Sequence, residues 1–117
     1  MSERLRLGQI PFLNSFPLHA GMVGTGTIDT VELVAAPPVP LAEMMRAGEL
    51  DVAPVSLIEY LRDADRYLLL PDLAIGANGA VRSVQLAGLE PPEQLSGRVV
   101  MTDLSATSQV LLQILLD

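Results

Sequence analysis

LRLGQIPFLNSFPL, residues 5–18 of the chain, predicts a strand that passes through a short loop into a helix. The alternation from Leu5 to Ile10 is typical of a strand, and Pro11 prevents its continuation as a central strand. Asn14 or Ser15 can then cap a helix, because short polar side chains accept hydrogen bonds from the free amides of a first turn. The stretch therefore predicts a β-loop-α unit, and it leaves open whether Asn14 also faces a ligand.

Along the rest of the chain, predicted strands alternate with predicted helices. Further strands are predicted at Val31 to Ala36, in DVAPVS (51–56), at Ser83 to Leu89 and at Val99 to Met101, with another buried run at Tyr67 to Leu70. Helices are predicted up to about Gly21 with a loop from Gly21 to Gly26, across VPLAEMMRAGEL with Gly48 as the stop, from Ser56, and from near Ser105. Such alternation favours an α/β domain with a largely parallel sheet, in which ligands bind beyond the carboxyl ends of the strands.

The net charge of the chain limits the classes of partner that it can bind. Fourteen acidic residues against seven arginines and no lysine give a net charge of -7, which opposes nonspecific binding to nucleic acid or to an anionic membrane. Aromatic residues make up only 3% of the chain, which leaves little for a base-stacking surface. A small anionic molecule stays open as a partner, since pocket amides, hydroxyls and a single arginine can outweigh a diffuse field at contact distance.

Cysteine is absent, which excludes a disulfide framework, a thiolate nucleophile and a sulfur-ligated metal. The opening MSERLRLGQIPF has no apolar signal core, and no run approaches the length of a membrane span, so the protein is expected to be cytoplasmic. His19 is the sole histidine, and the sequence shows no metal-ligand spacing and no glycine-rich phosphate loop. It therefore predicts neither a metal nor a cofactor, and it gives His19 no catalytic role.

Polar side chains gather where predicted strands give way to helices. The candidates are Asn14, Ser15, Ser56, Arg82, Ser83, Ser105, Thr107 and Ser108. Most of them can equally be helix caps; Arg82 and Ser83 could hold a carboxylate, or Arg82 could be an edge arginine with a solvated head. Three helix starts that offer oxygens and amides at one edge of a sheet would suit an anion. Glu59 invites a role as acid or base, but one turn into its helix it is expected to be a solvated side chain.

The chain resembles the chorismate dehydratases of the futalosine route to menaquinone in four stretches, taken in order and spacing: LRLGQIPFLNSFPL, AGELDVAPVSLIEYLRDADRYLLLPDLAI, VRSVQL and MTDLSATSQVLL. GELDVAPVS alone is generic to periplasmic-binding-protein-like folds, whereas its combination with PFLNSFPL and VRSV is more specific. The resemblance implies a type II periplasmic-binding-protein-like fold with the substrate in a cleft between two lobes. It also implies a lyase that eliminates water from chorismate, without a cofactor, to give 3-[(1-carboxyvinyl)oxy]benzoate.

By motif, the resemblance carries active-site roles to Asn14 of FLN and Ser83 of RSV. The residues that would line the cleft are Ser15, Ser56, Arg82, Ser105, Thr107 and Ser108. The chemistry suits hydroxyls and amides, because chorismate carries two carboxylates and its aromatisation needs positioning more than a powerful catalyst. Asn14 would orient the ring or the leaving hydroxyl, Ser83 would bind a carboxylate, and the substrate's own enolpyruvyl carboxylate would remove the C3 proton.

The same resemblance divides the chain into residues 1–95, most of a first α/β lobe, and residues 96–117, the first strand and helix of a second. Family members are much longer, and the final ILLD has no glycine, no following strand and no basic last turn. The sequence leaves open a truncated chain and a genuine small domain. An apolar helix face would make a truncated piece aggregate or form a homodimer; its residues are Leu111, Leu112, Leu115 and Leu116.

Three other functions stay open. The same fold often serves solute capture, so a cytoplasmic domain that binds a small anion without turnover is the first alternative. The sister enzyme that makes 1,4-dihydroxy-6-naphthoate has a similar fold, although its opening motif differs from FLNSFPL. The third is an inert piece that depends on a partner for folding.

Overall fold

The fold is built around one pair of parallel strands. The computed structural model describes residues 4–102 and 104–117, and in it β1 (Arg6–Gln9) pairs in parallel with β2 (Glu32–Ala35). At its other edge β1 meets Val52 in a single parallel bridge, with the Gly8 amide donating to the Val52 carbonyl at 2.8 Å. The strands predicted at Leu5 to Ile10 and at Val31 to Ala36 are confirmed. The strand predicted in DVAPVS is reduced to this single bridge. The spatial order is β2, β1, then the segment around Val52.

The helix after β1 is longer than predicted. A short 3-10 helix (Leu13–Ser15) leads into α1 (Phe16–Thr25), which Gly26 ends with a φ of 74°. This left-handed conformation favours glycine and is common just beyond a helix. The predicted end near Gly21, and the predicted loop from Gly21 to Gly26, are therefore wrong. An internal glycine costs a helix only about 1 kcal/mol, so Gly21 does not stop it.

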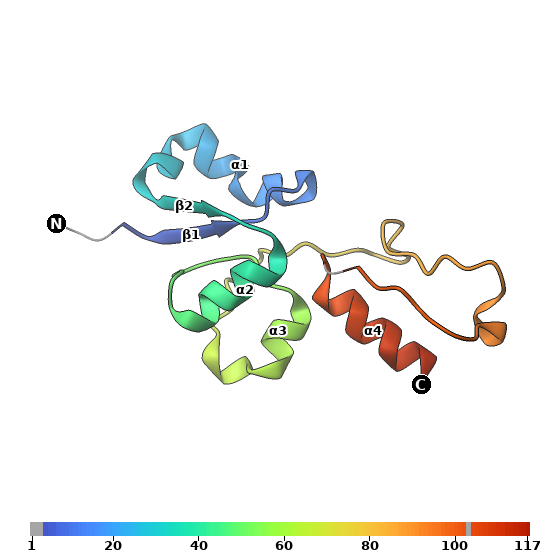
Figure 1. Cartoon of the computed structure of the whole chain (residues 1–117). Helices are drawn as coiled ribbons and strands as arrows, with labels where there is room; N and C mark the ends of the chain where they lie inside the picture. The colour runs from blue at the N-terminus through green and yellow to red at the C-terminus, as the bar shows by residue number, and fades with distance from the viewer. Residues whose placement is uncertain (1–3, 103) are drawn as a thin grey trace.

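The hydrophobic core lies between β1 and α2 (Pro38–Ala47), which Gly48 ends with a φ of 73°, as predicted. The buried apolar side chains are Leu7, Leu41, Ala42 and Leu50. Gly8 makes this packing close, because a Cβ there would lie 2.7 Å from the Cβ of Ala53. Figure 1 shows α1 and α2 on opposite sides of the strand pair, as expected when right-handed crossovers run first from β1 to β2 and then from β2 back across β1 to the segment around Val52.

Two further helices pack against each other. α3 (Leu57–Arg62) continues into a 3-10 helix (Ala64–Arg66), and α4 (Ala106–Leu116) lies against α3. Ser56 and Ser105 are the N-cap residues of these two helices, which confirms the predicted helix starts. Neither side chain makes a capping hydrogen bond, so both hydroxyls are left for other partners.

Residues 68–101, here called the extended arm, run away from the helices and back to α4 (Figure 1), with one 3-10 turn at Pro92–Gln94. The predicted strands at Ser83 to Leu89 and Val99 to Met101 are wrong, as is the predicted buried run, since Leu68 is 100% exposed. A strand needs a neighbour for its amides and carbonyls, and no other described segment forms a ladder with the arm. The arm helps to explain a radius of gyration of 17.1 Å, where a compact chain of this length has about 13 Å.

The described residues thus form a mixed α/β arrangement with a parallel strand pair. The type II periplasmic-binding-protein-like fold and the division at residue 95 stay predictions. Among residues 4–102 and 104–117, no helix has both the length and the apolarity that crossing a membrane requires.

Candidate functional site

The loops that follow β1 and Val52 leave the sheet at the same edge. Because β1 and the Val52 segment are parallel neighbours, their carboxyl ends point the same way, toward Asn14 in one connection and Ser56 in the other. The strand order also reverses at β1, and open α/β sheets bind ligands at such a reversal. The topology therefore brings Asn14 and Ser56 to the carboxyl end of the parallel strands, here called the candidate edge.

Asn14 is an exposed amide among exposed apolar side chains. It lies in the 3-10 helix after β1, and among the described residues its carboxamide has no hydrogen-bond partner. Phe12, Leu13 and Phe16 surround it in sequence and are 42%, 90% and 51% exposed. Small-molecule sites commonly combine such apolar walls with a few polar groups that fix orientation. This turn therefore combines an exposed amide with exposed apolar side chains, the two kinds of group that such sites use.

Ser15, the next residue, points the other way. Its side chain is fully buried, and its Oγ has no hydrogen-bond partner in the described structure. His19, one turn further along α1, is 5% exposed, and its Nε2 is also buried without a partner. Asn14 and Ser15 were predicted to share an edge facing a ligand, but here Asn14 faces outward while Ser15 faces the interior.

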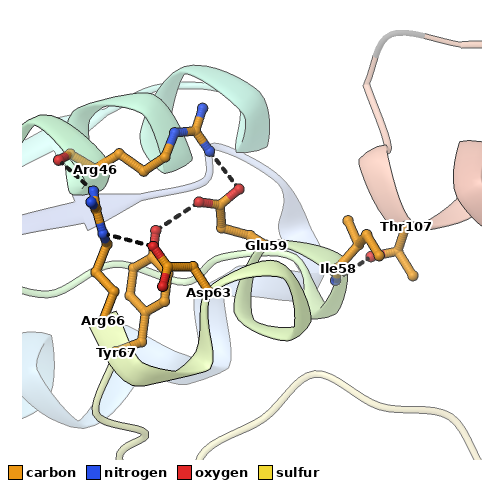
Figure 2. A network of polar contacts seen from close by, with 7 residues as sticks. All are labelled: Arg46, Ile58, Glu59, Asp63, Arg66, Tyr67 and Thr107. Carbon is orange, nitrogen blue, oxygen red and sulfur yellow. Dashed lines mark hydrogen bonds and ion pairs between the residues drawn. The ribbon is translucent and has the colours of Figure 1, made fainter.

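The hydroxyl groups at the starts of α3 and α4 lie close together. The Ile58 amide in the first turn of α3 donates to Thr107 Oγ1 at 3.3 Å (Figure 2), and Ser105 Oγ and Ser108 Oγ are 2.7 Å apart. Ser56 and Ala106, from the two helix starts, line one small cavity. The structure therefore joins two of the three helix starts that the sequence singled out.

Ser83 and Arg82 lie on the extended arm. Both are exposed, and the Arg82 carbonyl accepts a hydrogen bond from Gln85 Nε2 at 2.9 Å. Within the described residues no hydrogen bond or ion pair joins Ser83 or Arg82 to Asn14 or to the hydroxyls at α3 and α4. Their roles in a site stay predictions.

Figure 2 shows a network of polar contacts that the sequence analysis missed. Glu59, at 6% exposure, accepts hydrogen bonds from Arg46 Nη1 at 2.5 Å and from the Tyr67 hydroxyl at 2.6 Å. Arg66 Nη1 donates to the Arg46 carbonyl at 3.1 Å, and Arg66 pairs with Asp63 at 3.0 Å. The prediction that Glu59 is solvated is wrong, because two donors compensate the burial of its carboxylate.

The network fixes Glu59 as an anion. Burial alone would raise the pKa of Glu59, but the hydrogen bonds from Tyr67 and Arg46 outweigh it and hold that pKa below its ordinary value. Burial, reinforced by the Glu59 carboxylate, raises the pKa of Tyr67. A carboxylate held in this way is a structural anchor between α2 and α3 and a poor proton donor. No local spacing could have revealed the pair, since Arg46 and Glu59 lie 13 residues apart on different helices.

Two cavities in the described part of the chain differ in size and in position. The one between α2, α3 and the start of α4 has a volume of about 80 Å³, whereas pockets for small molecules have about 300–1,000 Å³. A cavity of about 260 Å³ lies beside Arg6 and Asp51, at the amino end of β1. Neither of these two cavities combines the volume of a small-molecule pocket with a position at this carboxyl edge. In the part of the chain that the structure describes, no three His, Asp or Glu side chains are grouped to hold a metal ion.

These features define an α/β domain whose parallel strand order reverses at β1, with an amide and hydroxyl groups at helix starts. A family model described as menaquinone biosynthesis matches residues 5–117, so the chain belongs to that family. The chain is also 34% identical over 110 residues to the chorismate dehydratase of Thermus thermophilus. The match covers 94% of this chain and 39% of that relative, so the chain spans about two fifths of the relative's length. The predicted family resemblance is confirmed.

Proposed function

We propose that the chain is part of a chorismate dehydratase, a lyase that eliminates water from chorismate to give 3-[(1-carboxyvinyl)oxy]benzoate in the futalosine route of menaquinone biosynthesis. The observation that carries the proposal is the match to a chorismate dehydratase across 94% of the chain, within a menaquinone-biosynthesis family. The carboxyl edge beside β1 is the part of this chain that we assign to substrate.

In this proposal Asn14 orients the ring or the leaving hydroxyl of chorismate. Its carboxamide is exposed and unpartnered, and the apolar side chains of Phe12, Leu13 and Phe16 are free to contact the ring. The C4 hydroxyl leaves as water with the proton from C3, which the enolpyruvyl carboxylate of the substrate removes. The electrons of the C3–H bond enter the ring, which becomes aromatic, so positioning contributes more than strong acid or base catalysis.

The carboxylates of the substrate need donors. Ser83, with Arg82 beside it, binds one of them in this proposal, and the start of α4 contributes further hydroxyls. Ser105 and Ser108 share one hydrogen bond at 2.7 Å and Thr107 accepts one from Ile58, so each hydroxyl at the start of α4 keeps bonding capacity for a carboxylate.

The fold belongs to the same proposal. A type II periplasmic-binding-protein-like architecture would make residues 1–95 most of one lobe and residues 96–117 the beginning of another. The extended arm supports this division, because it leaves the α/β unit and returns only at α4 without joining the parallel strand pair. In such a fold the cleft would lie between the lobes and would be closed by residues beyond those matched here.

The test is turnover of chorismate by the full-length protein that contains this sequence, followed by mass detection of the dehydrated product. The proposal predicts product and no requirement for an added cofactor or metal. Saturable binding of chorismate without product would contradict it and favour a small-anion binding domain of the same fold. Parallel assay of the 117-residue chain shows whether the matched part suffices.

A further inference from the structure

Two buried polar atoms of α1 and its N-cap lack a partner. Ser15 Oγ and His19 Nε2 are both shielded from solvent, and neither makes a hydrogen bond within the described structure. Ser15 is 0% and His19 5% exposed. Leaving a buried polar atom unpaired is unfavourable, because it loses its bonds to water, and most such atoms in folded proteins bond to the protein or to an ordered water.

The two side chains share one face of the helix. Ser15 is the N-cap residue and His19 lies four positions later, a spacing that places Cβ atoms about 5–6 Å apart on the same side. Phe16 and Val23, by contrast, are 51% and 52% exposed. The most buried side chain of α1 is therefore a polar one, which is unusual for the inner face of a surface helix.

We propose that Ser15 Oγ and His19 Nε2 together bind one buried water molecule beneath the first turn of α1, and that His19 is thereby a positioning residue for Asn14. The positioning role of His19 rests on the proposed function, whereas the water site does not. A water suits the site because buried waters typically bond to otherwise unsatisfied polar groups. A substrate-sized ligand does not suit it, since neither side chain is open to solvent.

The link to Asn14 runs through the backbone. Asn14 immediately precedes Ser15 in the same 3-10 helix, and the Ser15 side chain makes no capping bond to the first turn of α1. A water held by His19 fixes the Ser15 hydroxyl and so anchors the end of the turn that presents Asn14. Without this water, the turn would keep two unsatisfied atoms and would be free to shift.

The direct test is a crystal structure of the full-length protein at a resolution that shows ordered waters. The proposal predicts one density peak within hydrogen-bonding distance, about 2.7–3.2 Å, of both Ser15 Oγ and His19 Nε2. A direct hydrogen bond between the two side chains, or separate protein partners for them, would overturn it. This readout does not involve chorismate, so it is independent of the proposed activity.

A double-mutant cycle tests the shared water in solution. Ser15→Ala and His19→Phe each remove one partner, so the double variant should raise the unfolding equilibrium constant by less than the product of the two single effects. Independent, multiplicative effects would contradict a shared water. The control is Thr25→Ala with His19→Phe, because the Thr25 hydroxyl bonds at the far end of α1 to Gly21 O and to Thr27.

Kinetics test the positioning role. His19→Gln keeps a side-chain group that can bond the water, whereas His19→Phe does not. If the full-length protein dehydrates chorismate, kcat should fall more in His19→Phe than in His19→Gln, with KM changing less than kcat. Equal losses of kcat in the two variants would contradict positioning through the water, even where the dehydratase activity itself is established.

Discussion

At the scale of single residues, Gly8 shows why β1 can lie so close to the segment around Val52. The nearest contacts of an added Cβ would be Ala53 Cβ at 2.7 Å, Leu41 Cδ2 at 3.0 Å and Leu50 Cδ1 at 3.1 Å. All three belong to packed parts of the structure and not to the far ends of flexible surface chains. The absent side chain at Gly8 is therefore part of what brings the two carboxyl ends of the candidate edge together.

Gly8→Ala should destabilise the full-length protein by about 1–3 kcal/mol, because it overpacks this contact. Gly21→Ala is the matched control: Gly21 is inside α1 and has nothing within 4 Å of its added Cβ. That control should stabilise by up to about 1 kcal/mol, since alanine favours a helix. Denaturant unfolding measures both changes. Equal effects from the two substitutions would contradict the close packing at Gly8.

Glu59 and Asn14 show what the sequence could and could not say about individual residues. Asn14 was identifiable because proline, asparagine and serine follow a strand in a pattern that marks a strand end and a helix start. Burial of Glu59 was not identifiable, since it depends on Arg46 from another helix and on Tyr67 beyond the helix end. Local patterns predict which backbone conformation a residue adopts; they do not predict its distant partners.

At the scale of elements, ion pairs join segments that lie far apart in the sequence. Asp51 holds the segment before Val52 against β1: Arg6 Nη2 donates to Asp51 Oδ1 at 2.7 Å, and the Arg6 backbone amide donates to Oδ2 at 2.8 Å. Arg46 and Glu59 join α2 to α3 in the same way. The first contact ties β1 to the segment that leads to Ser56, and the second ties α2 to α3, the helix that follows Ser56.

The ion pair between Arg6 and Asp51 should make the stability of the fold depend on pH in acid. The hydrogen bonds from Arg6 lower the pKa of Asp51 from 3.8 to about 2. A carboxylate with a lowered pKa in the folded state stabilises the fold above its ordinary pKa, and this contribution is lost as the pH falls through the lowered value. The parent should therefore lose stability between about pH 4 and pH 2 more steeply than Asp51→Asn. Unfolding curves across this range measure it, and parallel slopes would contradict the pair.

Removing the buried carboxylate should loosen α3 from α2. Glu59→Gln should destabilise by about 1–3 kcal/mol, because the amide cannot accept from Arg46 and Tyr67 as a carboxylate does. Asp63→Asn is the control, since Asp63 pairs with Arg66 in an exposed position, at 52% and 49% side-chain exposure, and should cost at most about 1 kcal/mol. Similar losses for the two variants in thermal unfolding would show that the Glu59 network is not an anchor.

At the scale of the whole molecule, the sequence predicted the strand pair and most helix starts well and the extended arm poorly. β1, β2, α2 and the starts of α3 and α4 follow from local signals: alternation, glycine stops and serine starts. The strands predicted in the extended arm do not form, although Val84 and Leu86 alternate with Ser83 and Gln85 as a strand would. Alternation predicts that a segment can be a strand, but only a neighbouring strand makes it one.

The extended arm should be the first part of the 117-residue chain that trypsin cuts. Arg82 and Arg98 lie in it and are exposed, with no regular helix or strand around them. Arg46, in the last turn of α2 and bonded to Glu59, should be cut later. Mass spectrometry of a short time course gives the order. Cleavage at Arg46 before Arg82 and Arg98 would contradict the arm as described.

We propose that the full-length protein dehydrates chorismate and that Asn14, at the carboxyl edge beside β1, positions the substrate. The most direct measurement is the rate of product formation by the full-length protein and by its Asn14→Ala variant, with Thr30→Ala as the control because the Thr30 hydroxyl donates to the Thr27 carbonyl, away from the edge. We predict a loss in kcat/KM of more than about tenfold for Asn14→Ala and an unchanged rate for Thr30→Ala. A loss of about tenfold or less in Asn14→Ala would contradict the role of Asn14, and no product from the unmodified protein would contradict the dehydratase itself.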